Sequence, residues 1–181
     1  IPVDVSNATI TGIERTVVQV LMLDQPFLVD SFRLNLARLG LREKLLLHPL
    51  LLVEREADGT PALIGSGTTR ESYLYAEVSL VPDAAQREAH RAELERTFQQ
   101  IRDVVVDHPA MLKALRTHTS GLDAAGSPEL AVQTRELMDF LYWLTADNFV
   151  FLGYRRYDLR ETTQGWTIQA DPQSGLGSLR D

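Results

Sequence analysis

The sequence predicts an α+β fold in which two helices cover one face of an antiparallel sheet. The prediction rests on apolar, β-branched strand patterns at residues 16–23, 44–54 and 72–81, and on amphipathic helical patterns at residues 27–39 and after Pro82. The order strand, helix, strand, strand, helix opens a ferredoxin-like split β-α-β unit. This architecture hosts many functions, so it does not define one by itself.

The first half of the chain supplies the clearest elements. Residues 1–15 show no sustained hydrophobic period and are expected to form a lead-in with room for one short strand. Thr16–Leu23 is apolar almost throughout, which is typical of a buried strand. Pro26 ends that strand because proline lacks a backbone N–H. The following helix is expected to stop at Gly40.

The second half is expected to contain a long charged helix that His108-Pro109 kinks or interrupts, and then a further helix, a strand at Phe149–Leu159 and a hairpin. We therefore predict three regions, listed here by number: a lead-in at 1–15, the ferredoxin-like domain at 16–120, and a connecting helix with strand and hairpin at 127–181. The strand at Phe149–Leu159 either completes the first sheet or begins the next domain.

Composition excludes several classes of protein. The formal net charge of −7 disfavours binding to nucleic acid or to an anionic membrane surface, because both would repel the chain. The absence of cysteine excludes disulfides and thiolate ligands. No apolar run reaches the roughly 18 residues that a membrane span needs. Because the chain begins with Ile1 and ends at Asp181 without completing an element, we expect it to be a piece of a longer protein.

The turn between the first strand and the first helix is the most informative segment. A helix N-terminus presents unpaired N–H groups and a partial positive charge, so it can hold a carboxylate ligand. A structural interpretation competes with this one: Asp24 caps the helix and Asp30 lies in its first turn. The candidate ligand-binding residues are Asp24, Gln25, Pro26, Phe27, Leu28, Asp30 and Ser31.

No catalytic or metal-binding residue is predicted. Asp24 and Asp30 are six residues apart, a spacing that does not favour an acid–base pair. His48 precedes Pro49 within a strand, where a structural role is expected, and the other histidines lack the spacing of metal ligands. A small hydrolase using His48 with either aspartate is the least favoured alternative, because the sequence has no G-x-S-x-G motif.

Two stretches resemble a known family. The segment VVQVLMLDQPFLVDSFRLNLARLGL, followed by LLLHPLLLVEREADG, is similar to the first ACT-like module of large bacterial NAD-specific glutamate dehydrogenases. The later segment FLYWLTADNFVFLGYRRYDL, with GLGSLRD at the end, resembles the junction that follows that module. The resemblance covers residues 16–181 and implies an ACT-type version of the predicted fold.

The resemblance implies a cytoplasmic parent oxidoreductase that deaminates L-glutamate to 2-oxoglutarate and ammonium with NAD. Its catalytic and dinucleotide-binding domains are expected beyond Asp181, so no cofactor is expected in this fragment. ACT modules commonly bind amino acids at the first strand-to-helix turn and pair through their sheets.

We therefore expect a regulatory and assembly domain whose partners are downstream domains of the same chain and further copies in a homo-oligomer. Partnership with nucleic acid or a membrane is not expected. The alternative is a sensor that binds an amino-acid effector. Phe27 distinguishes the two hypotheses. It stands where the typical D-x-P-G-L turn has glycine, and its ring can fill the space that a ligand would use. An open pocket beside this ring favours the sensor, and a filled one favours the assembly domain.

Overall fold

The computed structural model describes residues 1–65, 67–120 and 128–180. The chain divides into two compact units, Ile1–Ile101 (unit 1) and Arg102–Asp181 (unit 2). Unit 1 contains β1 (Val3–Ile10), β2 (Ile13–Leu23), α1 (Leu28–Arg38), β3 (Glu43–Leu47), β4 (Leu50–Arg55), β5 (Pro61–Ile64), β6 (Thr69–Val78) and the first part of α2 (Ala84–Ser120). Unit 2 contains the rest of α2, α3 (Pro128–Trp143), the π-helical turn η1 (Leu144–Asn148), β7 (Gly153–Tyr154), β8 (Tyr157–Thr162), β9 (Gly165–Ala170) and β10 (Leu176–Gly177).

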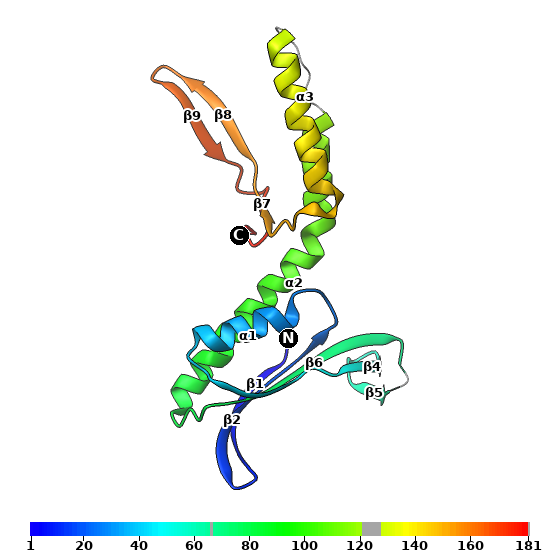
Figure 1. Ribbon diagram of the computed structural model, residues 1–181, viewed down its shortest axis with the longest axis vertical. Coiled ribbons are helices and arrows are strands. Elements are labelled where there is room, and N and C mark those ends of the chain that lie inside the picture. The colour runs from blue at the N-terminus through cyan, green and yellow to red at the C-terminus, as the bar shows by residue number, and fades with distance from the viewer. Residues whose placement is uncertain (66, 121–127, 181) are drawn as a thin grey trace. The chain divides into compact units, whose positions relative to one another are not determined.

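The sheet of unit 1 is antiparallel, with the strand order β1-β2-β6-β4-β5 and with β3 also paired to β6 (Figure 1). Strand β6 therefore lies between β2 on one side and β3 and β4 on the other. Helix α1 connects β2 to β3. This insertion of one strand between the two ends of a β-α-β crossover is the split β-α-β arrangement. The predicted α+β, ferredoxin-like fold is confirmed.

Strands β3 and β4 follow one line along β6. Leu47 lies opposite Tyr75 and Leu50 lies opposite Ser72, so the register is unchanged across His48-Pro49. The break arises because Pro49 has no N–H to donate, although its carbonyl still accepts the Tyr73 N–H at 3.1 Å. The strand predicted at residues 44–54 is thus present as two consecutive segments, β3 and β4, that run in the same direction and keep the same register with β6.

The lead-in expected at residues 1–15 forms a full strand of the sheet. β1 pairs with β2 from Val3 opposite Val20 to Ile10 opposite Ile13. It occupies the edge beside β2, where the strand that follows the second helix lies in a ferredoxin-like β-α-β-β-α-β unit. The sheet is therefore completed from the N-terminal side of the chain.

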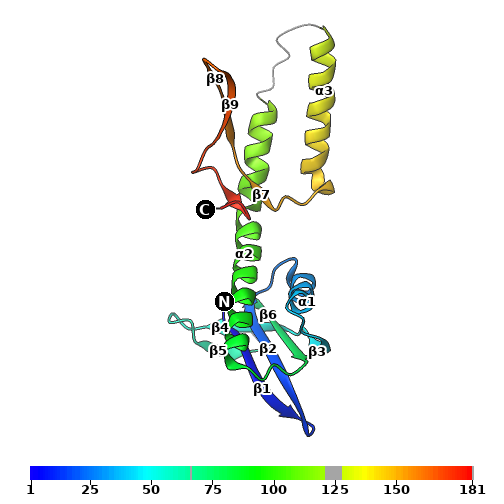
Figure 2. The same ribbon diagram turned by 90° about the vertical axis from the view of Figure 1, so that its left-hand side faces the viewer.

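One face of this sheet carries the core, beneath α1 and the first part of α2 (Figures 1 and 2). The Phe32 ring of α1 meets the Phe98 ring of α2 with centroids 6.0 Å apart. Alternation along the strands sends every second residue into this layer. The buried apolar residues at the centre are Val18, Val20, Leu28, Phe32, Leu36, Leu74, Ala76, Val78, Leu94 and Phe98.

Unit 2 differs from the expectations in two places. Pro109 does not interrupt α2, which runs through it from Ala84 to Ser120. The single strand predicted at Phe149–Leu159 is wrong, because that stretch contains the two-residue strand β7 and the start of β8. β7 pairs with β10 and β8 with β9, so neither joins the sheet of unit 1. The predicted division near residues 121–127 lies outside the described residues.

Candidate functional site

The turn between β2 and α1 is fastened to β6 by Asp24. The Ser72 hydroxyl donates to Asp24 Oδ1 at 2.8 Å, and Arg70 Nη2 lies 3.1 Å from Oδ2. The Asp24 backbone N–H also donates to the Arg70 carbonyl at 3.0 Å. Both carboxylate oxygens therefore already have partners within the domain.

Asp24 does not cap α1, so that prediction is wrong. The residue at the cap position is Phe27, which makes no side-chain cap bond and adopts a left-handed conformation with φ 71° and ψ 4°. Its carbonyl accepts the Ser31 N–H at 3.1 Å, which starts the helix. The left-handed region is costly for a residue with a Cβ atom. Glycine adopts it without that cost, which explains why typical turns have glycine at this position.

The remaining candidate residues of the turn point in different directions. Pro26 and Asp30 are exposed, whereas Leu28 belongs to the core. The Ser31 carbonyl accepts from Asn35 Nδ2 at 3.4 Å. Gln25 stands apart, because its buried Nε2 has no hydrogen-bond partner among the described residues. The turn thus offers one free buried donor and one carboxylate that is already engaged.

The first residues of β6 anchor both faces of the sheet. Glu71, between Arg70 and Ser72, faces the opposite side and receives two hydrogen bonds from Arg55, Nε to Oε1 at 2.5 Å and Nη2 to Oε2 at 2.7 Å. The hydrogen bonds from Arg55 lower the pKa of the Glu71 carboxyl, against the opposing effect of burial. Local sequence does not reveal this pair, because Arg55 and Glu71 are separated by 15 intervening residues.

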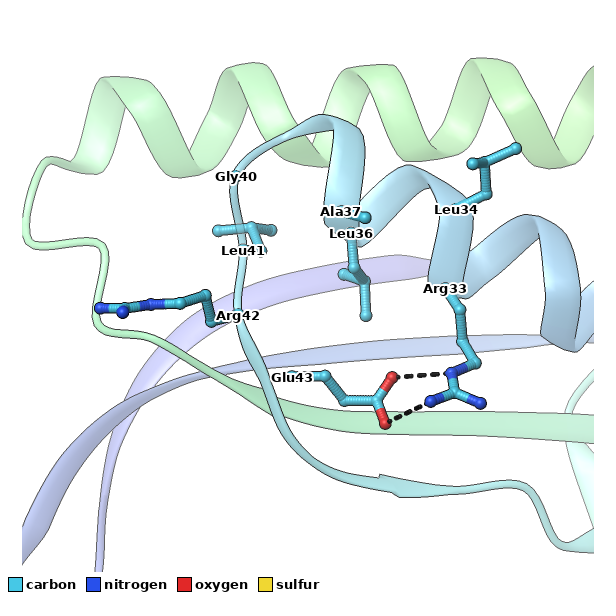
Figure 3. A pocket seen from close by; sticks show the side chains of 8 residues that line it. All are labelled: Arg33, Leu34, Leu36, Ala37, Gly40, Leu41, Arg42 and Glu43. Carbon is cyan, nitrogen blue, oxygen red and sulfur yellow. Dashed lines mark hydrogen bonds and ion pairs between the residues drawn. The ribbon is translucent and has the colours of Figure 1, made fainter.

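A concave region lies at the other end of α1. An open pocket is lined by Arg33, Leu34, Leu36, Ala37, Gly40, Leu41, Arg42 and Glu43 (Figure 3). Its lining includes a two-point ion pair in which Arg33 Nε donates to Glu43 Oε2 at 3.0 Å and Nη2 to Oε1 at 3.3 Å. Figure 3 also shows Arg42 directed away from that pair. None of these residues was a sequence candidate.

The histidine and acidic side chains of the described residues do not gather into a metal site. His48 and His90 each have a buried Nε2 without a hydrogen-bond partner among the described residues. Within residues 1–65, 67–120 and 128–180, no group of three or more His, Cys, Asp or Glu side chains could hold a metal ion. No helix of the described chain is long and apolar enough to cross a membrane.

The fold and the β2–α1 turn define the class of protein as a ferredoxin-like domain of the ACT type. A family model described as "Glutamate dehydrogenase, ACT1 domain" matches residues 3–94, which begin at β1. The chain belongs to this family. The family named from sequence resemblance is thereby confirmed.

Relatives that are each called "NAD-specific glutamate dehydrogenase" match most of the chain. The protein of Halomonas elongata is 31% identical over 172 residues, which are 91% of this chain and 11% of the relative. That of Pseudomonas aeruginosa is 30% identical over 171 residues, with the same two shares. That of Mycobacterium tuberculosis is 25% identical over 84% of this chain and 10% of the relative. The chain thus spans about a tenth of the length of these relatives.

Proposed function

We propose that this chain is the non-catalytic N-terminal regulatory and assembly domain of an NAD-dependent glutamate dehydrogenase. The parent enzyme would convert L-glutamate, NAD and water into 2-oxoglutarate, ammonium and NADH in the cytoplasm. The names of the relatives and the small share of their length that the chain covers support this assignment. NAD and the catalytic residues would belong to the remainder of the polypeptide.

One observation carries the choice of assembly over sensing: the Asp24 carboxylate is already bound on both oxygens. A free amino acid carries an ammonium group that needs an anionic or carbonyl acceptor. To take Asp24 as that acceptor, an effector would have to displace Ser72 and Arg70. In the resting domain this carboxylate serves to hold the turn on the sheet.

The contact surface for assembly would lie on the open side of the sheet. Within the described residues β3 pairs only with β6, so its outer edge presents unpaired backbone groups. Leu45 and Leu47 of β3 are 39% and 48% exposed, so this edge also offers apolar surface. An edge with both properties suits pairing with another copy of the domain.

Sedimentation velocity tests the proposed assembly role. The chain should form a dimer or larger species whose population grows with concentration, and Leu47→Lys should weaken it, because the new charge lies beside the pairing edge. Glu14→Lys, on exposed surface of β2, is the matched control and should leave association unchanged. A strictly monomeric chain at high concentration would contradict self-association through this edge.

An amino-acid sensor is the second candidate, and Gln25 is the observation that favours it. Its amide Nε2 is a buried donor without a partner among the described residues, in the turn where ACT-type sensors would hold a ligand. Such a donor could bind an effector carboxylate at low desolvation cost. If the chain is a sensor, Gln25→Ala should remove binding of that effector while unfolding remains cooperative.

A further inference from the structure

The hairpin β8–β9 has two chemically different faces. The register pairs Leu159 with Ile168 and Tyr157 with Ala170, so these residues share a face with Trp166. Glu161, opposite Trp166 next to the turn of the hairpin, is the charged residue on this face. Asp158, Arg160, Thr167 and Gln169 lie on the opposite face, which is polar. We define the hairpin apolar face as Tyr157, Leu159, Trp166 and Ile168.

This apolar face is open to solvent in the described chain. Its four side chains are 58% to 70% exposed, with Tyr157 at the lower limit and Ile168 at the upper. A two-stranded hairpin is marginally stable alone, and burial of one face against another element is what normally stabilises it. A contiguous exposed patch of this kind marks an interaction surface.

The rest of unit 2 also has many exposed apolar side chains and few buried ones among its described residues. Val104 and Met111 are the buried apolar side chains among its described residues, and both belong to α2. Beyond the hairpin, large apolar side chains are exposed along α3 and after it, at Val132, Leu137, Phe140, Trp143, Phe149, Val150 and Leu152. Within the described residues, unit 2 therefore exposes more large apolar side chains than it buries.

The base of the hairpin is held in place and lies close to the last described residues of the chain. An ion pair joins Arg156 to Asp171, and the Asp171 N–H donates to the Arg156 carbonyl at 2.9 Å. β10 pairs with β7, which directly precedes the hairpin. Past β10, Arg180 Nε donates to the buried Asp107 carboxylate at 3.1 Å. Residues following Asp181 would thus start beside the base of the hairpin.

We propose that the hairpin apolar face is covered by the segment of the same polypeptide that follows Asp181, as part of the core of the next domain. The matched region is 11% of the length of these relatives, so the rest of such a polypeptide is long enough to form that core. This inference deepens the proposed assembly role and rests on it for the existence of downstream domains. It uses unit 2, whereas self-association through β3 uses unit 1.

Hydroxyl-radical footprinting of the full-length polypeptide tests the inference, because exposed tryptophan and tyrosine side chains are oxidised rapidly. Trp166 and Tyr157 should be oxidised far more slowly in the native full-length protein than in its urea-unfolded form. Their protection should persist when the protein is diluted until its subunits dissociate. Protection that disappears on dilution would mean that a second copy covers the face, and rapid oxidation at every concentration would mean that nothing does. Either result would overturn the inference.

A pair of variants with the same added charge checks which face is covered. In the full-length protein, Ile168→Asp should abolish the protection of Trp166 and expose the following segment to limited proteolysis. Thr167→Asp, on the polar face of the same strand, should leave both unchanged. Equal effects of the two variants would contradict burial of the apolar face. A failure here leaves the sedimentation result for β3 unaffected, so the two proposals can fail separately.

Discussion

The Asp24 carboxylate and the Ser72 hydroxyl join the end of β2 to β6 through a hydrogen bond of 2.8 Å. Ser72 is fully buried, so its hydroxyl has no water to replace this acceptor. Asp24, which the sequence suggested as a ligand contact or a helix cap, therefore links the end of β2 to the central strand β6. It also fixes the point from which the β2–α1 turn begins.

A double-mutant cycle should detect the interaction between Asp24 and Ser72. Ser72→Ala should lower the free energy of unfolding by about 1 kcal/mol, the usual net value of one hydrogen bond. Combined with Asp24→Ala, it should reveal a coupling energy of about 0.5–1.5 kcal/mol, because each variant removes the same bond. Urea denaturation measures all four proteins. Strictly additive effects would contradict a direct interaction.

The Arg55–Glu71 pair should make stability depend on pH. Arg55 lowers the pKa of Glu71 in the folded state, so the contribution of this carboxylate is fully present above its unfolded pKa. It is lost as the pH falls through the lower folded pKa. Glu71→Gln should cost about 1.5–3 kcal/mol at neutral pH, the range for hydrogen bonds to charged groups.

That cost should shrink steadily in acid, which denaturation midpoints at a series of pH values would show. Glu56→Gln, which alters an exposed glutamate, is the matched control and should change the midpoint little at any pH. A cost for Glu71→Gln that stays constant down to low pH would mean that the pair does not titrate as described.

Phe27 should respond differently to glycine and to alanine. Both substitutions remove the ring, which is 44% exposed, but only glycine relieves the left-handed backbone at φ 71°. Phe27→Gly should therefore be more stable than Phe27→Ala by about 1 kcal/mol. Thermal unfolding of the two variants gives this difference. Equal stability would indicate that the turn relaxes out of the left-handed region.

Thr16 should hold β1 on the edge of the sheet. Its buried hydroxyl donates to Asn7 Oδ1 at 2.8 Å and accepts the Val81 N–H at 2.8 Å. Thr16→Val keeps the shape but leaves the Val81 donor unsatisfied, so unfolding free energy should fall by about 2 kcal/mol. Thr9→Val, on exposed surface of β1, should change it little. An unchanged denaturation midpoint for Thr16→Val would contradict the role given to this hydroxyl.

Strand β1 is longer than the one short strand expected within residues 1–15, and its residues show where hydrophobic periodicity fails as a predictor. β1 has only one buried apolar side chain, Val3, and places the polar Asn7 opposite Thr16. A polar residue that is satisfied by a buried hydroxyl breaks the alternation on which strand prediction depends. The central strands and α1 were predictable because their apolar residues contact the core at regular intervals.

The turn and the C-terminal strands were harder for different reasons. An aspartate before a helix usually caps it, but here the cap position falls on Phe27 and Asp24 is used by β6. Most of the apolar residues in Phe149–Leu159 are exposed. Their residue types are those of a buried strand, so sequence alone does not distinguish the two. Neither the partner of Asp24 nor the exposure of that run is recorded in local sequence.

Calorimetric titration of the chain against amino acids, 2-oxoglutarate and NAD tests the central claim most directly. The assembly account predicts no saturable heat and no change in thermal midpoint with any of them. A ligand at about 100 times its dissociation constant would raise the free energy of unfolding by about 2.7 kcal/mol, which is readily detected. Saturable binding of an amino acid that Gln25→Ala abolishes would contradict the assembly account and establish the domain as a sensor.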